Sequence, residues 1–295
     1  MMNNKGMSTT DLKGLKLFNK GKVRDVYEVD NYLLIIATDR ISAFDVIMPN
    51  PIPGKGEILT RMSVFWFNRM KDIVENHLVS TNPLDFPEEC SPFMKELKGR
   101  SMLVKKAEPL PVECVVRGYL SGSGWKDYLH SKTISGIKLP GGLKESSKLS
   151  EPLFTPSTKA PSGEHDMAIA RKEMENIIGP ERTEKIIEIS LAIYNRASKT
   201  AEESGIIIAD TKMEFGIIED QLTLIDELLT PDSSRFWPRE DYEEGRPQKS
   251  FDKQFLRDYL ISLKWNQKPP APELPNEIIE KTKAKYEEAL NRLVK

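Results

Sequence analysis

The segment IIIADTKMEFG, residues 206–216, constrains the fold more strongly than any other part of the chain. It begins with four apolar residues that favour a buried strand, and charged residues then occupy alternate positions. Because alternate side chains of a strand share a face, we expect Asp210, Lys212 and Glu214 to line one face of a sheet. A second β-favouring run, residues 222–229, follows after three polar residues and predicts a β-hairpin.

The register of this hairpin decides which carboxylates meet. If Glu219–Gln221 form a three-residue turn, Glu214 lies directly opposite Asp226. Like charges opposed across two strands destabilise a sheet, and a divalent cation such as Mg²⁺, which prefers oxygen ligands, would relieve the repulsion. A shift of one residue would put Glu227 in place of Asp226. A hairpin with its charged face in water predicts the same pattern, so the pattern alone leaves both interpretations open.

The composition argues against several classes of protein. The chain has 295 residues and a formal net charge of -2, so no overall basic field favours nucleic acid or an anionic membrane. No apolar run approaches the length of a membrane span, and the polar N-terminus lacks the apolar core of a secretory signal. Cys90 and Cys114 have no metal-type spacing, so we expect free thiols in a cytoplasmic protein.

The order of the predicted elements indicates an α+β protein with two lobes and a cleft between them. We expect a disordered tail over residues 1–10, a β-rich N-terminal lobe over 11–108 and an α+β C-terminal lobe over 109–295. The first lobe includes a predicted helix over residues 57–77. Residues 131–164 and 230–248 lack periodicity and are rich in turn-forming residues, so both are predicted to be loops.

Two further clusters of charge could bind anions. Lys22 and Arg24 alternate on a strand directly after a glycine, although a strand with these cations in water explains them at least as well. Glu113 and Arg117 share one face of an apolar strand that ends in a Ser-Gly-Ser-Gly turn, residues 121–124. An arginine beside such a turn is a plausible phosphate site, and an ordinary polar turn is the alternative.

Seven segments occur in the order in which they appear in the SAICAR synthetase (phosphoribosylaminoimidazole-succinocarboxamide synthase) family, and the resemblance runs from about Gly21 to Arg257. These segments are GKVRDVYEV, TDRISAFDV, IPGKGEILT, PVECVVRGYLSGS, SGEHD, IADTKMEFG and LTPDSSRFW. The chain resembles the longer members, since shorter bacterial members tend to have Lys at the position of Arg24 and a tighter loop between the two acidic segments. The different loop length leaves open whether Asp226 or Glu227 corresponds to the second acidic residue of the family.

The resemblance implies a two-lobed fold with ATP in the cleft, similar to kinases and ATP-grasp enzymes. It also implies a reaction of de novo purine biosynthesis, in which ATP, carboxyaminoimidazole ribotide (CAIR) and L-aspartate give SAICAR, ADP and phosphate through an acyl phosphate. A small-molecule kinase with the same Mg–ATP site is the alternative. Neither nucleic acid nor membrane is an implied partner, and the oligomeric state is left open.

The same resemblance assigns roles to individual residues. Those implied to contact ATP are Lys22, Arg24 and Lys106. Those implied to contact the ribotide are Glu113, Arg117, Ser123, Arg235 and Arg257. Asp210 and Lys212 would act where the carboxylate is activated, and Glu214 and Asp226 would hold Mg²⁺. Lys159, His165 and Asp166, at or near the end of the 131–164 segment, are candidates for binding aspartate or for closing the site. His165–Asp166 could equally be a proton-transfer pair or a helix cap, and we expect the segment itself to act as a mobile lid.

Overall fold

The computed structural model describes residues 6–159, 166–251 and 253–294, which form two compact units. The first unit comprises Met1–Phe67, His77–Lys106 and Phe251–Lys295, and the second comprises Asn68–Asn76 and Ala107–Ser250. The chain crosses between the units at four points, and one of them, Lys106–Ala107, is close to the boundary expected near residue 108. The C-terminal helices, however, group with the first unit, whereas the sequence placed them with the second.

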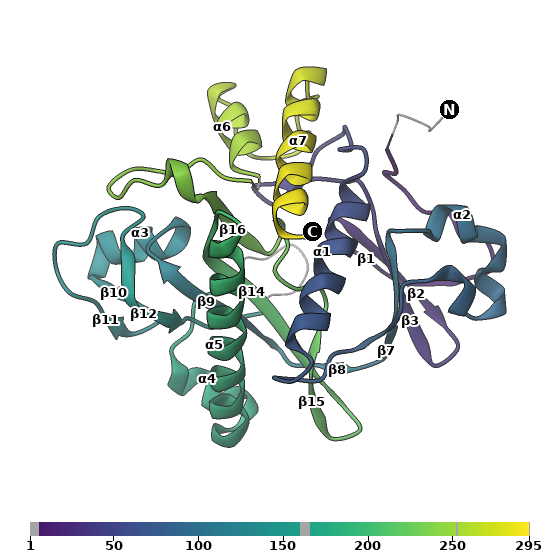
Figure 1. The fold of residues 1–295 in the computed structure, drawn as a ribbon, viewed down its shortest axis with the longest axis horizontal. Coiled ribbons are helices and arrows are strands. Elements are labelled where there is room, and N and C mark those ends of the chain that lie inside the picture. The colour runs from purple at the N-terminus through teal and green to yellow at the C-terminus, as the bar shows by residue number, and fades with distance from the viewer. Residues whose placement is uncertain (1–5, 160–165, 252, 295) are drawn as a thin grey trace. The chain divides into compact units, whose positions relative to one another are not determined.

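A five-stranded antiparallel sheet forms the centre of the first unit (Figure 1). Its strands, in spatial order, are β1 (Lys16–Lys20), β2 (Arg24–Val29), β3 (Tyr32–Ala37), β7 (Ser101–Lys105) and β6 (Leu78–Ser80). Burial alternates along β2, where Asp25, Tyr27 and Val29 are buried. A small hairpin, β4 (Ser42–Ala43) and β5 (Val46–Ile47), follows β3, and the unit also holds α2 (Met94–Leu97), α6 (Gln254–Ser262) and α7 (Asn276–Leu293).

Helix α1 covers Lys55–Met70 and is shorter than the predicted helix over 57–77. The chain beyond Met70 instead reaches the hairpin of the second unit. There Leu224 N–H donates to Glu75 C=O at 2.9 Å, and Asn76 forms a parallel bridge with Leu224. Pairing with a strand edge therefore replaces the last helical turns, a long-range effect that helical periodicity cannot report.

The second unit is built around one long strand, β14 (Ile206–Ile218). It pairs antiparallel with strands from before and after it in the chain, namely β9 (Val112–Tyr119), β15 (Gln221–Ile225), β16 (Ser234–Pro238) and β8 (Glu108–Pro109). Strands β12 (Lys148–Phe154) and β13 (Ser157–Thr158) pair in turn with β9. Helix α5 (Pro180–Glu203) packs along β14 and β9, with α4 (Arg171–Ile178) against it, and α3 (Gly122–Ser131) follows β9 (Figure 1).

Both predicted loops contain strands, so those predictions were wrong. Residues 131–164 include β12, β13 and a small hairpin, β10 (Thr133–Ile134) with β11 (Ile137–Lys138). Residues 230–248 include β16. Strands β12, β13 and β16 form by pairing with β9 or β14, and β10 and β11 pair with each other. Such pairing gives little periodic signal in the sequence. Because β12 and β13 belong to the sheet, a lid over the whole 131–164 segment does not fit the described residues, and 160–164 lie outside them.

The hairpin of β14 and β15 has a two-residue turn instead of the predicted three-residue one. Glu219 and Asp220 both have positive φ, 48° and 62°, as a type I′ turn requires, and Ile218 pairs with Gln221. The register that follows puts Ile225, and not Asp226, opposite Glu214. Within the described residues, no helix is long and apolar enough to cross a membrane.

Candidate active site

One face of β14 carries the three predicted charged residues, and their contacts confirm that they share it. Asp210, Lys212 and Glu214 all reach charged partners on that face, while the intervening Thr211 and Met213 are buried behind the strand. Two charged clusters result, one around Asp210 and one around Lys212 and Glu214.

In the first cluster, two arginines converge on the carboxylate of Asp210. The register places Asp210 opposite Arg117 of β9 on one side and opposite Arg235 of β16 on the other. Arg117 Nη1 donates to Asp210 Oδ2 at 3.0 Å, and Arg235 Nη1 donates to the same oxygen. Burial lowers the pKa of Arg117, and the charge of Asp210 opposes that effect. Two guanidinium groups in contact with one carboxylate leave an excess of positive charge.

The Ser-Gly-Ser-Gly turn wraps closely around these arginines. Arg117 Nη2 donates to Ser123 Oγ at 3.1 Å, and Ser121 Oγ donates to Asp210 Oδ2 at 3.4 Å. Gly122 has φ +57°, which favours glycine, and a Cβ there would lie 2.3 Å from Arg235 Nη2, so a larger residue would displace that guanidinium group. Helix α3 begins at Gly122, and its first N–H groups add to the positive potential. Arginines, serines and a helix N-terminus together form a site suited to a phosphate group.

In the second cluster, Lys212 lies between two carboxylates. Its ammonium group donates to Glu113 of β9 and, at 3.3 Å, to Glu214 Oε1. Burial by itself lowers the pKa of Lys212, but the charges of Glu214 and Glu113 outweigh burial and raise it. Burial raises the pKa of Glu113, and Lys212 opposes that shift. Lys159 Nζ donates to Glu214 Oε2 at 2.5 Å, so each oxygen of Glu214 has a cation beside it.

The surroundings of Glu214 fit a cation that is shared with a phosphate group. Asp226 follows β15 and has φ 68°. Its charge helps to raise the pKa of Lys212, so Asp226 lies near this cluster, although the residue opposite Glu214 in the hairpin is Ile225. Glu227 is buried and accepts a hydrogen bond from Thr230 Oγ1 at 2.7 Å. No group of three or more potential metal ligands exists among the described residues. Two carboxylates are nonetheless the protein ligand set with which Mg²⁺ commonly binds when substrate phosphates complete its coordination.

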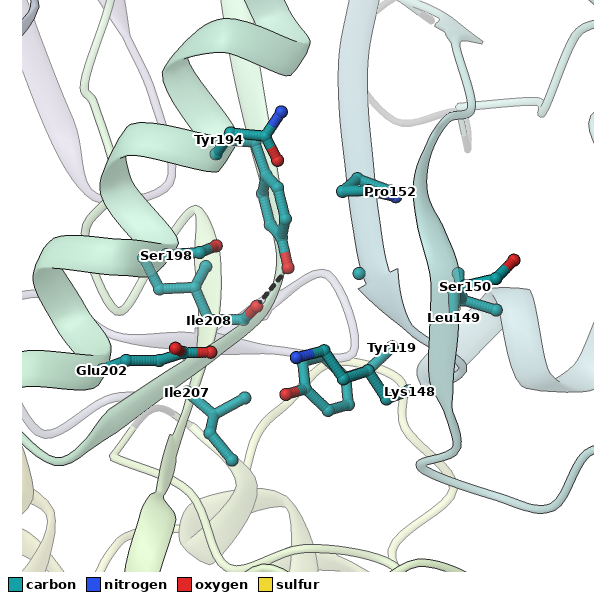
Figure 2. Close-up of a pocket in the computed structure, with 12 residues that line it drawn as sticks. Tyr119, Lys148, Leu149, Ser150, Pro152, Tyr194, Ser198, Glu202, Ile207 and Ile208 are labelled. Carbon is teal, nitrogen blue, oxygen red and sulfur yellow. Dashed lines mark hydrogen bonds between the residues drawn. The ribbon is translucent and has the colours of Figure 1, made fainter.

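Helix α5 supports the other face of the sheet behind these residues. Tyr194 Oη donates to Ile208 C=O at 2.6 Å, as Figure 2 shows, and a Cβ at Gly118 would lie 2.0 Å from that hydroxyl. The pairing of β14 with β16 shifts between Ile208 and Asp210, where Ala209 forms a bulge. A cavity of about 200 Å³ lies beside Tyr194. Tyr194 therefore fixes the backbone directly next to Arg117 and Asp210.

The remaining predicted residues are divided between the two units. Lys22, Arg24, Lys106 and Arg257 belong to the first unit. Lys22 Nζ pairs there with Asp45, and Lys106 Nζ donates to Glu28 Oε1 at 3.2 Å. The negative charge of Asp166 contributes to raising the pKa of Glu113. His165 lies outside the described residues.

The sequence includes Ser121 in the Ser-Gly turn beside Arg117 without giving it a role of its own, and its hydroxyl contacts Asp210. The sequence gives no sign of a second hydroxyl in the arginine cluster, that of Thr155. This hydroxyl accepts a hydrogen bond from Arg117 Nε at 3.0 Å, and it lies in the segment predicted to be a loop, where no local signal marks it.

Comparison with known proteins gives one consistent result. The model of the SAICAR synthetase family matches residues 17–272. The chain is 62% identical to phosphoribosylaminoimidazole-succinocarboxamide synthase of Desulfosudis oleivorans over 97% of both chains, and 62% identical to that of Thermodesulfovibrio yellowstonii over 95% of both. Among solved structures, a SAICAR synthase of Saccharomyces cerevisiae complexed with SAICAR superposes with a TM-score of 0.89 at 46% identity, covering 97% of both chains.

The fold is that of an α+β protein, and its arginine cluster has the residues and charge suited to an anionic, phosphate-bearing group. The chain belongs to the SAICAR synthetase family and is an ATP-dependent carbon–nitrogen ligase of purine biosynthesis. The alternative of a small-molecule kinase is not favoured, because these three relatives are all synthases.

Proposed function

We propose that this enzyme joins L-aspartate to the carboxyl group of CAIR through an acyl phosphate. In this proposal the arginine cluster on β14 binds the ribotide, and the reaction takes place at the cluster of Lys212 and Glu214. The observation that carries the proposal is the pair of arginines, Arg117 and Arg235, held by Asp210 next to the Lys212 cluster on one strand face. The yeast relative was solved with SAICAR, the product of this reaction, which supports the assignment.

The arginine cluster binds the phosphate of the ribotide. Arg117, Arg235 and Ser123 supply donors at the N-terminus of α3, where a phosphate gains both hydrogen bonds and favourable charge. Asp210 is then a positioning residue, because its carboxylate holds both guanidinium groups in place. Glu113 lies further along β9 on the same face and would contact the imidazole end of the ribotide. Arg257 is a further candidate for the ribotide phosphate.

Chemistry takes place beside Lys212. A carboxylate oxygen of CAIR attacks the γ-phosphorus of ATP and ADP leaves, which turns a poor leaving group into phosphate. The aspartate amine then attacks the carbonyl carbon, the C–O bond to phosphate breaks and the amine loses a proton. The ammonium group of Lys212 offsets the repulsion between these negatively charged substrates, and charge placement of this kind supplies much of the rate enhancement in such reactions.

Glu214 and Asp226 would hold Mg²⁺, which when bound neutralises the phosphates of ATP. Lys22, Arg24 and Lys106 are proposed to contact ATP. Lys159 is proposed to pair with a carboxylate of aspartate, because its ammonium group lies at Glu214 beside Lys212. His165 and Asp166 stay candidates for the same substrate. The two free buried thiols, Cys90 and Cys114, support a reducing, cytoplasmic location.

An assay of ADP release tests this function. With ATP, Mg²⁺, CAIR and L-aspartate all present, we expect steady release of ADP together with an equal amount of amide product. Omission of either CAIR or aspartate should abolish steady release. Full-rate ADP release without aspartate would instead identify a kinase and overturn the proposal.

A further inference from the structure

Three successive carbonyl groups of one turn are held by a single short segment of the first unit. The turn covers Gly21–Val23 and is closed by Gly21 N–H donating to Arg24 C=O at 2.8 Å. Arg40 Nη2 donates to Gly21 C=O at 2.9 Å, and Arg40 Nε donates to Lys22 C=O at 3.1 Å. Thr38 completes the set, because its N–H and its Oγ1 both donate to Val23 C=O, at 3.0 and 2.7 Å.

Arg40 is itself fully engaged and buried. Its side chain is 6% exposed and forms an ion pair with Asp25, whose side chain is 1% exposed, at 2.6 Å. Its Nη1 group also donates to Ser8 C=O at 2.9 Å. The planar guanidinium group can span two carbonyls and a carboxylate at fixed geometry, which a lysine ammonium cannot. Because Asp25 follows Arg24 directly in β2, the turn is fixed at both of its ends.

The same stretch of chain also holds a side chain of the turn. Asp45 lies in the tight connection between β4 and β5, where Phe44 and Asp45 have φ 52° and 62°. Its carboxylate pairs with Lys22 Nζ. Residues 38–45 thus fix the backbone of the turn through Thr38 and Arg40 and the ammonium group of Lys22 through Asp45.

We propose that Arg40 is a positioning residue that fixes the Gly21–Val23 turn, and with it Lys22 and Arg24, in the geometry that receives the phosphates of ATP. This proposal rests on the proposed function only for the role of Lys22 and Arg24. A buried guanidinium group whose donors are left incompletely paired destabilises the fold. Here Nε and Nη2 donate to two carbonyls of the turn, and the remaining donors contact Asp25 and Ser8 C=O. The turn is therefore preorganised before ATP binds, which lowers the ordering cost of binding.

Arg40→Lys tests the proposal in the full-length enzyme, since it keeps a cation beside Asp25 but cannot span the carbonyls. We expect the KM for ATP to rise about tenfold and kcat to change less than about threefold, as loss of roughly one charged hydrogen bond predicts. Hydrogen–deuterium exchange should quicken at residues 20–24. The matched control is Arg196→Lys, the same substitution at an arginine of the second unit that pairs with the carboxylate of Asp72 and donates to Arg69 C=O at 3.0 Å.

The control should leave both the KM for ATP and exchange at 20–24 unchanged, even where thermal stability falls. The proposal is overturned if Arg40→Lys leaves both quantities at wild-type values, or if Arg196→Lys changes them equally. Should Arg40→Lys not fold, Thr38→Val removes only the hydroxyl contacts of that side chain, and we expect the same changes at smaller size.

Lys22→Met separates this proposal from the proposed function. A normal KM for ATP in Lys22→Met would refute the phosphate role of Lys22, while the exchange measurement would still decide whether Arg40 fixes the turn. A raised KM in Lys22→Met together with unchanged values in Arg40→Lys would refute the positioning role alone.

Discussion

Lys212 of β14 and Glu113 of β9 are joined by an ion pair across neighbouring strands. The register of these strands ends at Met213 opposite Cys114, so Glu113 and Glu214 are the next residues on their strands. Two carboxylates would repel each other at this position, and the ammonium group of Lys212 donates to both. The cation that relieves the repulsion is thus supplied by the protein itself, and this cation lies where we propose that the reaction takes place.

Replacing Lys212 by Met removes that cation. We expect kcat/KM to fall by about 10³-fold, because a positioned charge of this kind commonly contributes two to three orders of magnitude. The fold should persist, since the pKa of Glu113 is already raised by burial and rises further without Lys212, which lets that carboxyl become neutral. Steady-state kinetics and circular dichroism measure the two effects. Lys199→Met, on exposed surface of α5, is the control, and near-normal activity of Lys212→Met would refute the assigned role.

Replacing Glu214 by Gln should raise the Mg²⁺ concentration for half-maximal activity by about tenfold, since one charged oxygen ligand is lost. Glu219→Gln, at the hairpin turn, should behave as wild type. Asp226→Asn should resemble Glu214→Gln, whereas Glu227→Gln should mainly lower stability, because Glu227 is buried against Thr230. A Mg²⁺ titration of the four variants decides this, and an unchanged requirement in Glu214→Gln would contradict the metal assignment.

Replacing Gly122 by Ala should weaken ribotide binding selectively. The new Cβ would lie 2.3 Å from Arg235 Nη2, and the φ of +57° adds a penalty of about 1 kcal/mol for any other residue. We expect the KM for CAIR to rise at least about tenfold while the KM for ATP stays within about twofold. Gly141→Ala is the matched control, because its Cβ would meet nothing within 4 Å. Equal kinetics in the two variants would argue against a ribotide site at Arg235.

The buried thiols should resist alkylation in the folded enzyme. Burial raises the pKa of Cys90 to about 11, and it also raises the pKa of Cys114. At pH 8, iodoacetamide should therefore react slowly with both thiols until urea unfolds the chain, and mass spectrometry of the adducts measures this. Fast labelling of the folded enzyme would show that these sites are open.

The same shift predicts a pH dependence of stability. Because the folded-state pKa of Cys90 lies above its ordinary value of 9.0, the folded state binds the proton more tightly. The stabilisation is fully present below pH 9 and is lost as the pH rises through about 11. The free energy of unfolding should fall less steeply over this range in Cys90→Ala than in the wild type. Identical slopes in urea titrations would contradict the shift.

Much of the site could be predicted because it depends on the local period of one strand. The alternation in residues 206–216 correctly put Asp210, Lys212 and Glu214 on one face, and the spacing of Glu113 and Arg117 put those two residues on one face of their own strand. In each case a pattern of two residues per repeat fixes the direction of the side chains, whatever the neighbouring strands are.

What failed depends on pairing between distant segments. Arg235 lies beside Asp210 only because β16 forms on the edge of β14, and a short isolated strand has little signal of its own. The hairpin register turned on whether two or three residues make the turn at Glu219, a choice that the sequence around it does not settle. The contacts of Arg40 to the Gly21–Val23 turn likewise join segments that no local period connects.

The most direct test of the proposed acyl phosphate follows oxygen from the substrate into phosphate. CAIR labelled with ¹⁸O at both carboxylate oxygens is converted with ATP and L-aspartate, and the released phosphate is analysed by mass spectrometry or ³¹P NMR. We predict that each phosphate carries one ¹⁸O atom and that the amide keeps the other, because the carboxylate oxygen becomes bonded to phosphorus before the amine attacks. Unlabelled phosphate with normal amide formation would show that the carboxyl group is not phosphorylated and would contradict this mechanism.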